Sequence, residues 1–114
     1  MAKVRSDLLQ GTLDMIVLKT LELEPQHGWA ISQRIRHISQ GVFDLNDGSL
    51  YPALQRLERK GWITSSWQVT ENNRRARYYR LTGAGRKRLA VEERKWVRAS
   101  TAVNRILGIA YAGG

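Results

Sequence analysis

Apolar residues recur at helical spacing in two stretches near the start of the chain. Residues 8–24 carry an apolar stripe that includes Leu13 and predict an amphipathic first helix. Residues 24–28 (EPQHG) form a breaker cluster and predict a turn. Residues 29–39 predict a second helix, which Gly41 is expected to end. The residues expected on its inner side are Trp29 or Ala30, Ile31, Ile35 and Ile38.

A third helix is predicted for the stretch NDGSLYPALQRLERKGWI at residues 46–63. Its leucines Leu50, Leu54 and Leu57 fall at positions i, i+4 and i+7 and form a narrow stripe that should face the core. The capping candidates are Asn46 or Asp47 at the start and Gly61 at the end.

Pro52 lies inside this predicted helix, where a proline normally kinks or breaks the backbone. A start near Ser49 would place Pro52 in the first turn, where a backbone donor has no intrahelical partner to lose. A cap at Asn46 or Asp47 would place it deeper. We therefore favour the later start or a tightened first turn.

Period-two alternation follows the third helix. Residues 62–69 (WITSSWQV) are rich in β-branched and aromatic residues and predict a strand, and residues 77–81 (RYYRL) predict the returning strand. Residues 70–75 are polar and predict the turn between them. Two strands joined by a basic turn after a third helix form a hairpin of the kind called a wing.

A long helix is predicted at about residues 83–109, with Thr82 as its N-cap. Apolar residues lie seven apart along it and form a heptad seam over roughly three repeats. This seam could pack back on its own domain, but we favour self-association because it is too long for three short helices to cover. The residues assigned to a dimer interface are Leu89, Trp96, Ala99, Val103, Ile106 and Leu107.

This order of elements predicts a mainly α (α+β) fold, the winged helix-turn-helix, with three helices and a two-stranded wing. We expect a winged helix-turn-helix DNA-binding domain at residues 1–82 and a C-terminal dimerisation helix at residues 83–114. In such domains the third helix is the one that enters the major groove.

The net charge of +9 is unevenly distributed. Residues 1–73 hold 8 Lys and Arg against 8 Asp and Glu, whereas residues 74–98 hold 10 against 2. A charge run is often only a solvated face, but a segregated basic block is also typical of a protein that binds a polyanion. Nucleic acid is the leading partner, and an anionic membrane surface is the weaker alternative.

The sequence carries few of the residues that catalysis or metal binding would need. The chain has no cysteine, and its histidines, His27 and His37, have neither metal-ligand nor triad spacing. His27 fits a turn or a helix cap better than a catalyst. We expect no enzyme activity, metal or cofactor, and no signal peptide or membrane span near the N-terminus. A cytoplasmic location fits this pattern.

The DNA-contacting residues are expected on the third helix and the wing, because Gln can pair with adenine, Arg with guanine, and small or basic side chains with phosphate. Tyr78 and Tyr79 should point to opposite faces of the strand, one into the core and one toward the backbone of the DNA. The third-helix candidates are Ser49, Tyr51, Pro52, Gln55, Arg56, Arg59 and Lys60. The wing candidates are Asn73, Arg74, Arg75, Arg77 and Tyr79.

Trp96 lies in the middle of the heptad seam. An indole at this position most often packs in a core or an interface. In a dimer, however, two such rings near the two-fold axis could stack on a flat aromatic ligand, so Trp96 is also the candidate effector-binding residue.

Four segments in combination resemble the PadR family of bacterial transcriptional regulators over about residues 8–107: LLQGTLDMIVLKTLE, HGWAISQRI, GSLYPALQRLERKGWI and RRARYYRLTGAGRKRL. The single short C-terminal helix resembles the subgroup with a minimal dimerisation region. The wing loop TENNRRA lacks the glycine that many members have.

This resemblance implies a homodimeric repressor that binds an inverted-repeat operator and leaves it when a small, often aromatic, effector binds. It carries DNA contacts over to Ser49, Tyr51, Gln55, Arg56 and the wing arginines, and an effector cavity at the dimer interface to Trp96. Two alternatives remain open: a non-specific nucleic-acid-binding basic protein, and an adaptor that acts through its dimer helix.

Overall fold

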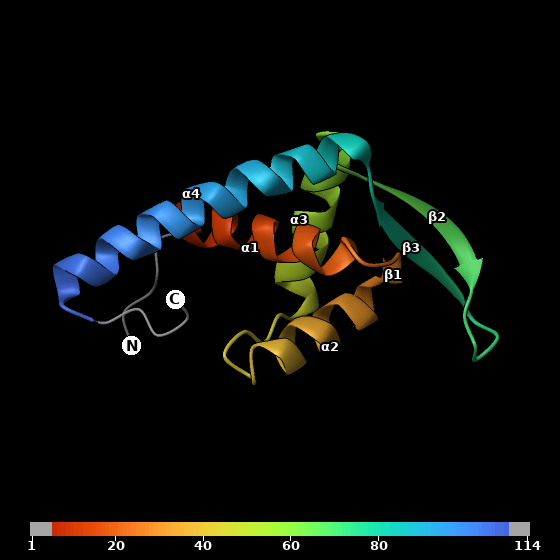
Figure 1. Ribbon diagram of the computed structural model, residues 1–114. Helices are drawn as coiled ribbons and strands as arrows, with labels where there is room; N and C mark the ends of the chain where they lie inside the picture. Colours follow the sequence, from red (N-terminus) through yellow and green to blue (C-terminus); the bar gives the residue numbers. More distant parts are fainter. Residues whose placement is uncertain (1–5, 110–114) are drawn as a thin grey trace.

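A computed structural model of the protein describes residues 6–109 (Figure 1). The elements in chain order are α1 (Ser6–Leu21), β1 (Gln26–His27), α2 (Gly28–Ile38), α3 (Asp47–Arg59), β2 (Ile63–Val69), β3 (Arg75–Leu81) and α4 (Gly83–Leu107). Three helices, a hairpin and a long fourth helix follow one another as predicted. The fold is therefore a winged helix-turn-helix with a long C-terminal helix.

The sheet has a third strand that the sequence pattern did not predict. β1 pairs antiparallel with β3, with Gln26 opposite Tyr79 and His27 opposite Tyr78, so the strand order is β1-β3-β2. The sequence predicts only a turn here, because two residues are too short to show alternation. The pairing ties the start of α2 to the base of the wing.

Helix α2 begins with a histidine cap. The His27 Nδ1 accepts a hydrogen bond from the Ala30 backbone N–H at 3.3 Å, which confirms the predicted capping role. Ile31 and Ile35 are buried. Ile38 was predicted to face inward, but 65% of it is exposed because it lies in the last turn, beyond the core.

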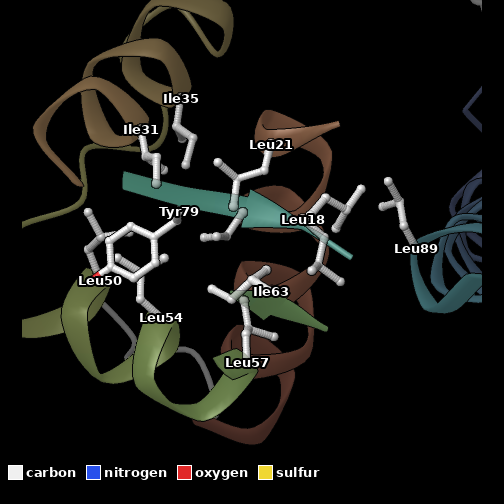
Figure 2. Close-up of a cluster of buried hydrophobic side chains, with 12 residues drawn as sticks. Leu18, Leu21, Ile31, Ile35, Leu50, Leu54, Leu57, Ile63, Tyr79 and Leu89 are labelled. Carbon is white, nitrogen blue, oxygen red and sulfur yellow. The ribbon is translucent and has the colours of Figure 1, made fainter. Parts of the chain in front are cut away.

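The core lies where α1, α2 and α3 meet the inner face of the wing strands (Figure 2). The predicted leucine stripe of α3 is fully buried, at 1% or less of exposed surface for each of Leu50, Leu54 and Leu57. Burial of this apolar stripe on one face of α3 leaves the opposite face free to carry polar residues. The remaining members of the cluster are Val17, Leu18, Leu21, Ile31, Ile35, Ile63, Tyr79, Leu81 and Leu89.

Leu89 requires a correction to the predicted dimer interface. Only 1% of it is exposed in the protomer, where it packs into the core and holds α4 along α1 (Figures 1 and 2). A residue that is already covered within one chain offers no surface to a second chain. The seam available for association therefore begins after this residue.

Helix α3 begins earlier than predicted. Its N-cap is Asn46, whose side-chain Oδ1 accepts from the Ser49 backbone N–H at 2.9 Å, and its first residue is Asp47. Pro52 is consequently the sixth residue of the helix, in the second turn. Because a proline has no N–H, the Gly48 carbonyl receives no donor from it, but both residues lie on the exposed side where solvent can supply one.

A tight joint connects the end of α3, the base of the wing and the start of α4. The Trp62 N–H donates to the Leu57 carbonyl at 3.1 Å, and the Trp62 carbonyl accepts from the Thr82 N–H at 3.1 Å. The Thr82 hydroxyl donates to the Gly61 carbonyl at 2.7 Å and accepts from the Gly85 N–H at 3.0 Å, which confirms Thr82 as the cap of α4. These bonds fix the wing at the end of the third helix.

Candidate nucleic-acid interface

The face of α3 opposite the buried leucines is polar and exposed. It carries two side chains suited to reading base edges, Gln55 and Arg59. Lys60 is the C-cap residue of the helix, and its Nζ lies 5.1 Å from the centre of the Trp62 ring. Most of the third-helix candidates are therefore on one accessible surface. The exposed candidates are Ser49, Tyr51, Pro52, Gln55, Arg59 and Lys60.

Tyr51 is exposed at only 40%, because its ring packs over the first residue of α2. A Cβ atom at Gly28 would lie 2.5 Å from the Tyr51 hydroxyl oxygen. Glycine at this position therefore lets α3 approach the start of α2. The tyrosine links the two helices of the helix-turn-helix while one edge stays accessible.

Arg56 occupies a different place from the other candidates. Its guanidinium forms an ion pair with Asp14 of α1, and their side chains are only 22% and 15% exposed. The pair ties α3 to α1, so this guanidinium is already engaged with a carboxylate. The ion pair leaves the Arg56 guanidinium less free for its predicted base contact than Gln55 and Arg59, which face outward.

Arg56→Gln is expected to lower the free energy of unfolding by about 1–3 kcal/mol, since it leaves the Asp14 carboxylate without its partner. Arg59→Gln, on the exposed face of the same helix, should change it by less than about 0.5 kcal/mol. Urea unfolding of both variants measures the difference. Equal stability of the two variants would show that the pair with Asp14 does not hold α3 in place.

The wing turns through an asparagine. Asn73 has a φ of 59° and donates from its N–H to the Thr70 carbonyl at 2.9 Å, while the Thr70 N–H donates to the Arg74 carbonyl at 2.7 Å. Asparagine tolerates the left-handed conformation better than most residues, so it replaces the glycine that the loop lacks. The tip places Asn73, Arg74 and Arg75 at the surface.

Trp67 was not among the predicted site residues. It lies directly opposite Arg77 in the hairpin, and the guanidinium carbons of Arg75 and Arg77 lie 5.2 and 5.7 Å from its ring centre. The indole is 57% exposed. The pairing register of the hairpin brings residues 67, 75 and 77 to one face. Strand alternation combined with this register is the feature that would have indicated the cluster.

The prediction of a wing contact for Tyr79 is corrected by its burial. Strand alternation points Tyr79 inward with Leu81, each 6% exposed, and burial raises the pKa of the Tyr79 hydroxyl. Tyr78 lies on the other face and is half-buried. Its ring packs edge-on against the His27 ring, with 5.3 Å between the two ring centres. The tip of the wing is therefore open to a partner, whereas Tyr79 is not.

The apolar side of α4 beyond Leu89 is largely uncovered in the protomer. Trp96 is 48% exposed, and it borders a groove of about 550 Å³ between α1, the end of α2 and α4, together with Ile16, Ile38 and Phe43. The other predicted seam residues are also exposed: Ala99, Val103, Ile106 and Leu107.

The part of the chain that the structure describes holds neither a candidate metal site nor a membrane-spanning helix. Residues 6–109 contain no group of three or more His, Asp or Glu side chains that could hold a metal ion. No helix within the same range is long and apolar enough to cross a membrane. Three surfaces of the described residues stand out: the exposed face of α3, the basic wing and the apolar side of α4.

Comparison with known proteins agrees with this geometry. Residues 17–91 match the Transcriptional regulator PadR-like family. The transcriptional regulator Rv3488 of Mycobacterium tuberculosis is 38% identical over 69 residues, which cover 60% of each chain. The family match spans the whole helix-turn-helix and the wing.

Solved structures show the same fold. A transcriptional regulator from Clostridium thermocellum is 30% identical, with a TM-score of 0.78 over 87% of this chain and 96% of that one. A PadR family transcription regulator from Clostridium difficile is 28% identical, with a TM-score of 0.73 over 83% of this chain and 97% of that one. The chain belongs to the PadR-like family of transcriptional regulators, whose members are not enzymes.

Proposed function

We propose that the protein is a homodimeric repressor that binds an inverted-repeat operator in double-stranded DNA. The observation that carries this proposal is the outward face of α3, with Gln55 and Arg59, beside a wing tip that carries Arg74 and Arg75. Gln and Arg side chains discriminate adenine and guanine in the major groove. Cations at the wing tip suit phosphates and the flanking minor groove.

The exposed apolar side chains of α4 support the inverted-repeat part of the proposal. The uncovered side of α4 carries Trp96, Val103 and Ile106, of which 48%, 50% and 84% is exposed. Pairing of two such helices would bury these residues and present two recognition helices related by a two-fold axis, as a palindromic operator requires. Residues 1–82 would then be the DNA-binding unit and residues 83–114 the dimerisation unit, working in the cytoplasm.

An effector site is proposed at the groove beside Trp96. The groove combines an indole with the apolar side chains of Ile16, Ile38 and Phe43, a lining that suits a small flat aromatic molecule. A ligand there would contact α1, α2 and α4 together, and so could alter how the two DNA-binding units are spaced. Quenching of tryptophan emission by a planar aromatic compound should be lost in Trp96→Ala and kept in Trp29→Ala.

Selection of bound duplexes from a random DNA pool tests the proposed function. The expected result is enrichment of one inverted repeat whose half-sites lie about one helical turn, or a multiple of it, apart. A pool that remains unenriched after repeated rounds would instead favour the non-specific nucleic-acid-binding alternative.

A further inference from the structure

Three side chains form a continuous polar link between α3 and the wing. Glu58 lies on α3, Ser65 on β2 and Arg77 on β3. The Ser65 hydroxyl donates to the Glu58 Oε2 at 2.6 Å and accepts from the Arg77 Nε at 2.8 Å. The Arg77 Nη2 lies 3.6 Å from the same carboxylate oxygen. Both hydrogen bonds of the Ser65 hydroxyl are charge-assisted, because one partner is the Glu58 carboxylate and the other is the Arg77 guanidinium.

The link lies where the wing leaves the core. Ile63 is buried and Ser65 is half-buried, but every β2 residue after Ser65 is exposed. A two-stranded ribbon has little stability of its own, so its angle to the rest of the domain depends on the few contacts at its base. The Glu58–Ser65–Arg77 link is a polar contact from the recognition helix to this outer part of the wing.

The Arg77 guanidinium is further restricted by the ring of Trp67, at 5.7 Å from the ring centre. It therefore contacts a carboxylate, a hydroxyl and an indole within its own domain. Arg74 and Arg75 differ, because neither forms an ion pair with any acidic residue in the described range 6–109. Of the three wing arginines, Arg77 is the least available to a phosphate.

We propose that Glu58, Ser65 and Arg77 act as a strut that fixes the wing relative to α3. The strut determines which flanking base pairs the wing reaches when α3 lies in the major groove, so the inference rests on the proposed function. Arg77 is then a positioning residue, and phosphate contact belongs to Arg74 and Arg75. A wing held in its binding geometry avoids the ordering cost that a loose wing would incur on DNA.

Ser65→Ala tests the strut, because it removes the hydroxyl that both partners share. We expect affinity for the duplex enriched from the random pool to fall about tenfold, with a change of less than about twofold for random duplex. Protection of the flanking base pairs in a hydroxyl-radical footprint should weaken as well. Ser65→Thr keeps the hydroxyl and should restore both affinity and protection.

Ser66→Ala is the matched control. Residue 66 lies on the opposite face of the same strand, where its hydroxyl accepts from the Gln68 Nε2 at 3.3 Å. This variant should leave the affinities for both duplexes unchanged. Thermal unfolding of each variant establishes that the domain is folded, and Glu58→Gln serves as a second strut variant should Ser65→Ala fail to fold.

The salt dependence of binding separates a strut from a phosphate contact. Arg74→Gln should reduce the slope of log affinity against log salt concentration by about 1, whereas Arg77→Gln should change the slope no more than Ser65→Ala does, because both strut variants act only through the position of the wing. A larger reduction of the slope in Arg77→Gln than in Ser65→Ala, or a wild-type specificity ratio in Ser65→Ala, would overturn the strut alone. Equal binding of the enriched and random duplexes by the wild-type protein would instead overturn the proposed function, and the strut with it.

Discussion

Gly85→Ala is expected to lower the free energy of unfolding by about 3 kcal/mol, at the upper end of the cost of overpacking, or to prevent folding. A Cβ atom at this position would lie 2.0 Å from the Trp62 carbonyl oxygen, a separation that no real Cβ contact shows. That oxygen accepts the Thr82 N–H and belongs to the joint between α3, the wing and α4. Because the obstacle is backbone, no side-chain rotation can relieve it. Urea or thermal unfolding measures the loss.

Gly83→Ala is the control for this substitution. Gly83 lies in the same first turn of α4, and a Cβ atom there would meet nothing within 4 Å. Because alanine favours helix over glycine, Gly83→Ala should be neutral or stabilising by up to about 1 kcal/mol. Equal stability of the two variants would contradict the tight joint between the wing and α4.

Trp96→Glu is expected to raise the dissociation constant of the proposed homodimer at least about a hundredfold, because the interface would then bury an unpaired carboxylate at its centre. The indole is half exposed in the protomer, so the substitution should leave the domain folded. Light scattering or sedimentation over a range of protein concentrations measures the change. The monomeric variant should also lose affinity for a two-half-site operator more than for a single half-site.

Ala90→Glu provides the matched control on α4. Residue 90 is exposed and lies away from the apolar seam, so the same charge there should leave the dimer intact. An unchanged dimer in Trp96→Glu would remove α4 from the proposed interface. Dissociation by both variants would show only a general sensitivity of α4 to negative charge.

Most of the fold could be predicted because its elements carry local signals. The leucines of α3, the alternation of the wing strands and the Thr82 cap each identify an element from neighbouring residues alone. β1 could not be predicted, because a two-residue strand exists only through its pairing with β3. The predicted start of α3 was too late, because a proline considered alone favours the first turn of a helix. In the structure the Asn46 cap outweighs that preference.

Where the structure departs from the pattern expected of the candidate site, the cause is contact between residues that are distant in the chain. Arg56 lies on the polar side of α3 in the sequence pattern, but its partner Asp14 is 42 residues away. Leu89 fits the heptad seam equally well as a core residue, and only the packing of α4 on α1 decides between them. For Tyr78 and Tyr79, alternation predicts opposite faces without saying which face is inside.

The central claim is sequence-specific DNA binding by the outward face of α3 and the wing. Its most direct test is the affinity of the wild-type protein for the enriched inverted repeat and for a scrambled duplex of equal length and composition, at physiological salt. The account predicts at least about a thousandfold preference for the inverted repeat. Equal affinity for the two duplexes would contradict it.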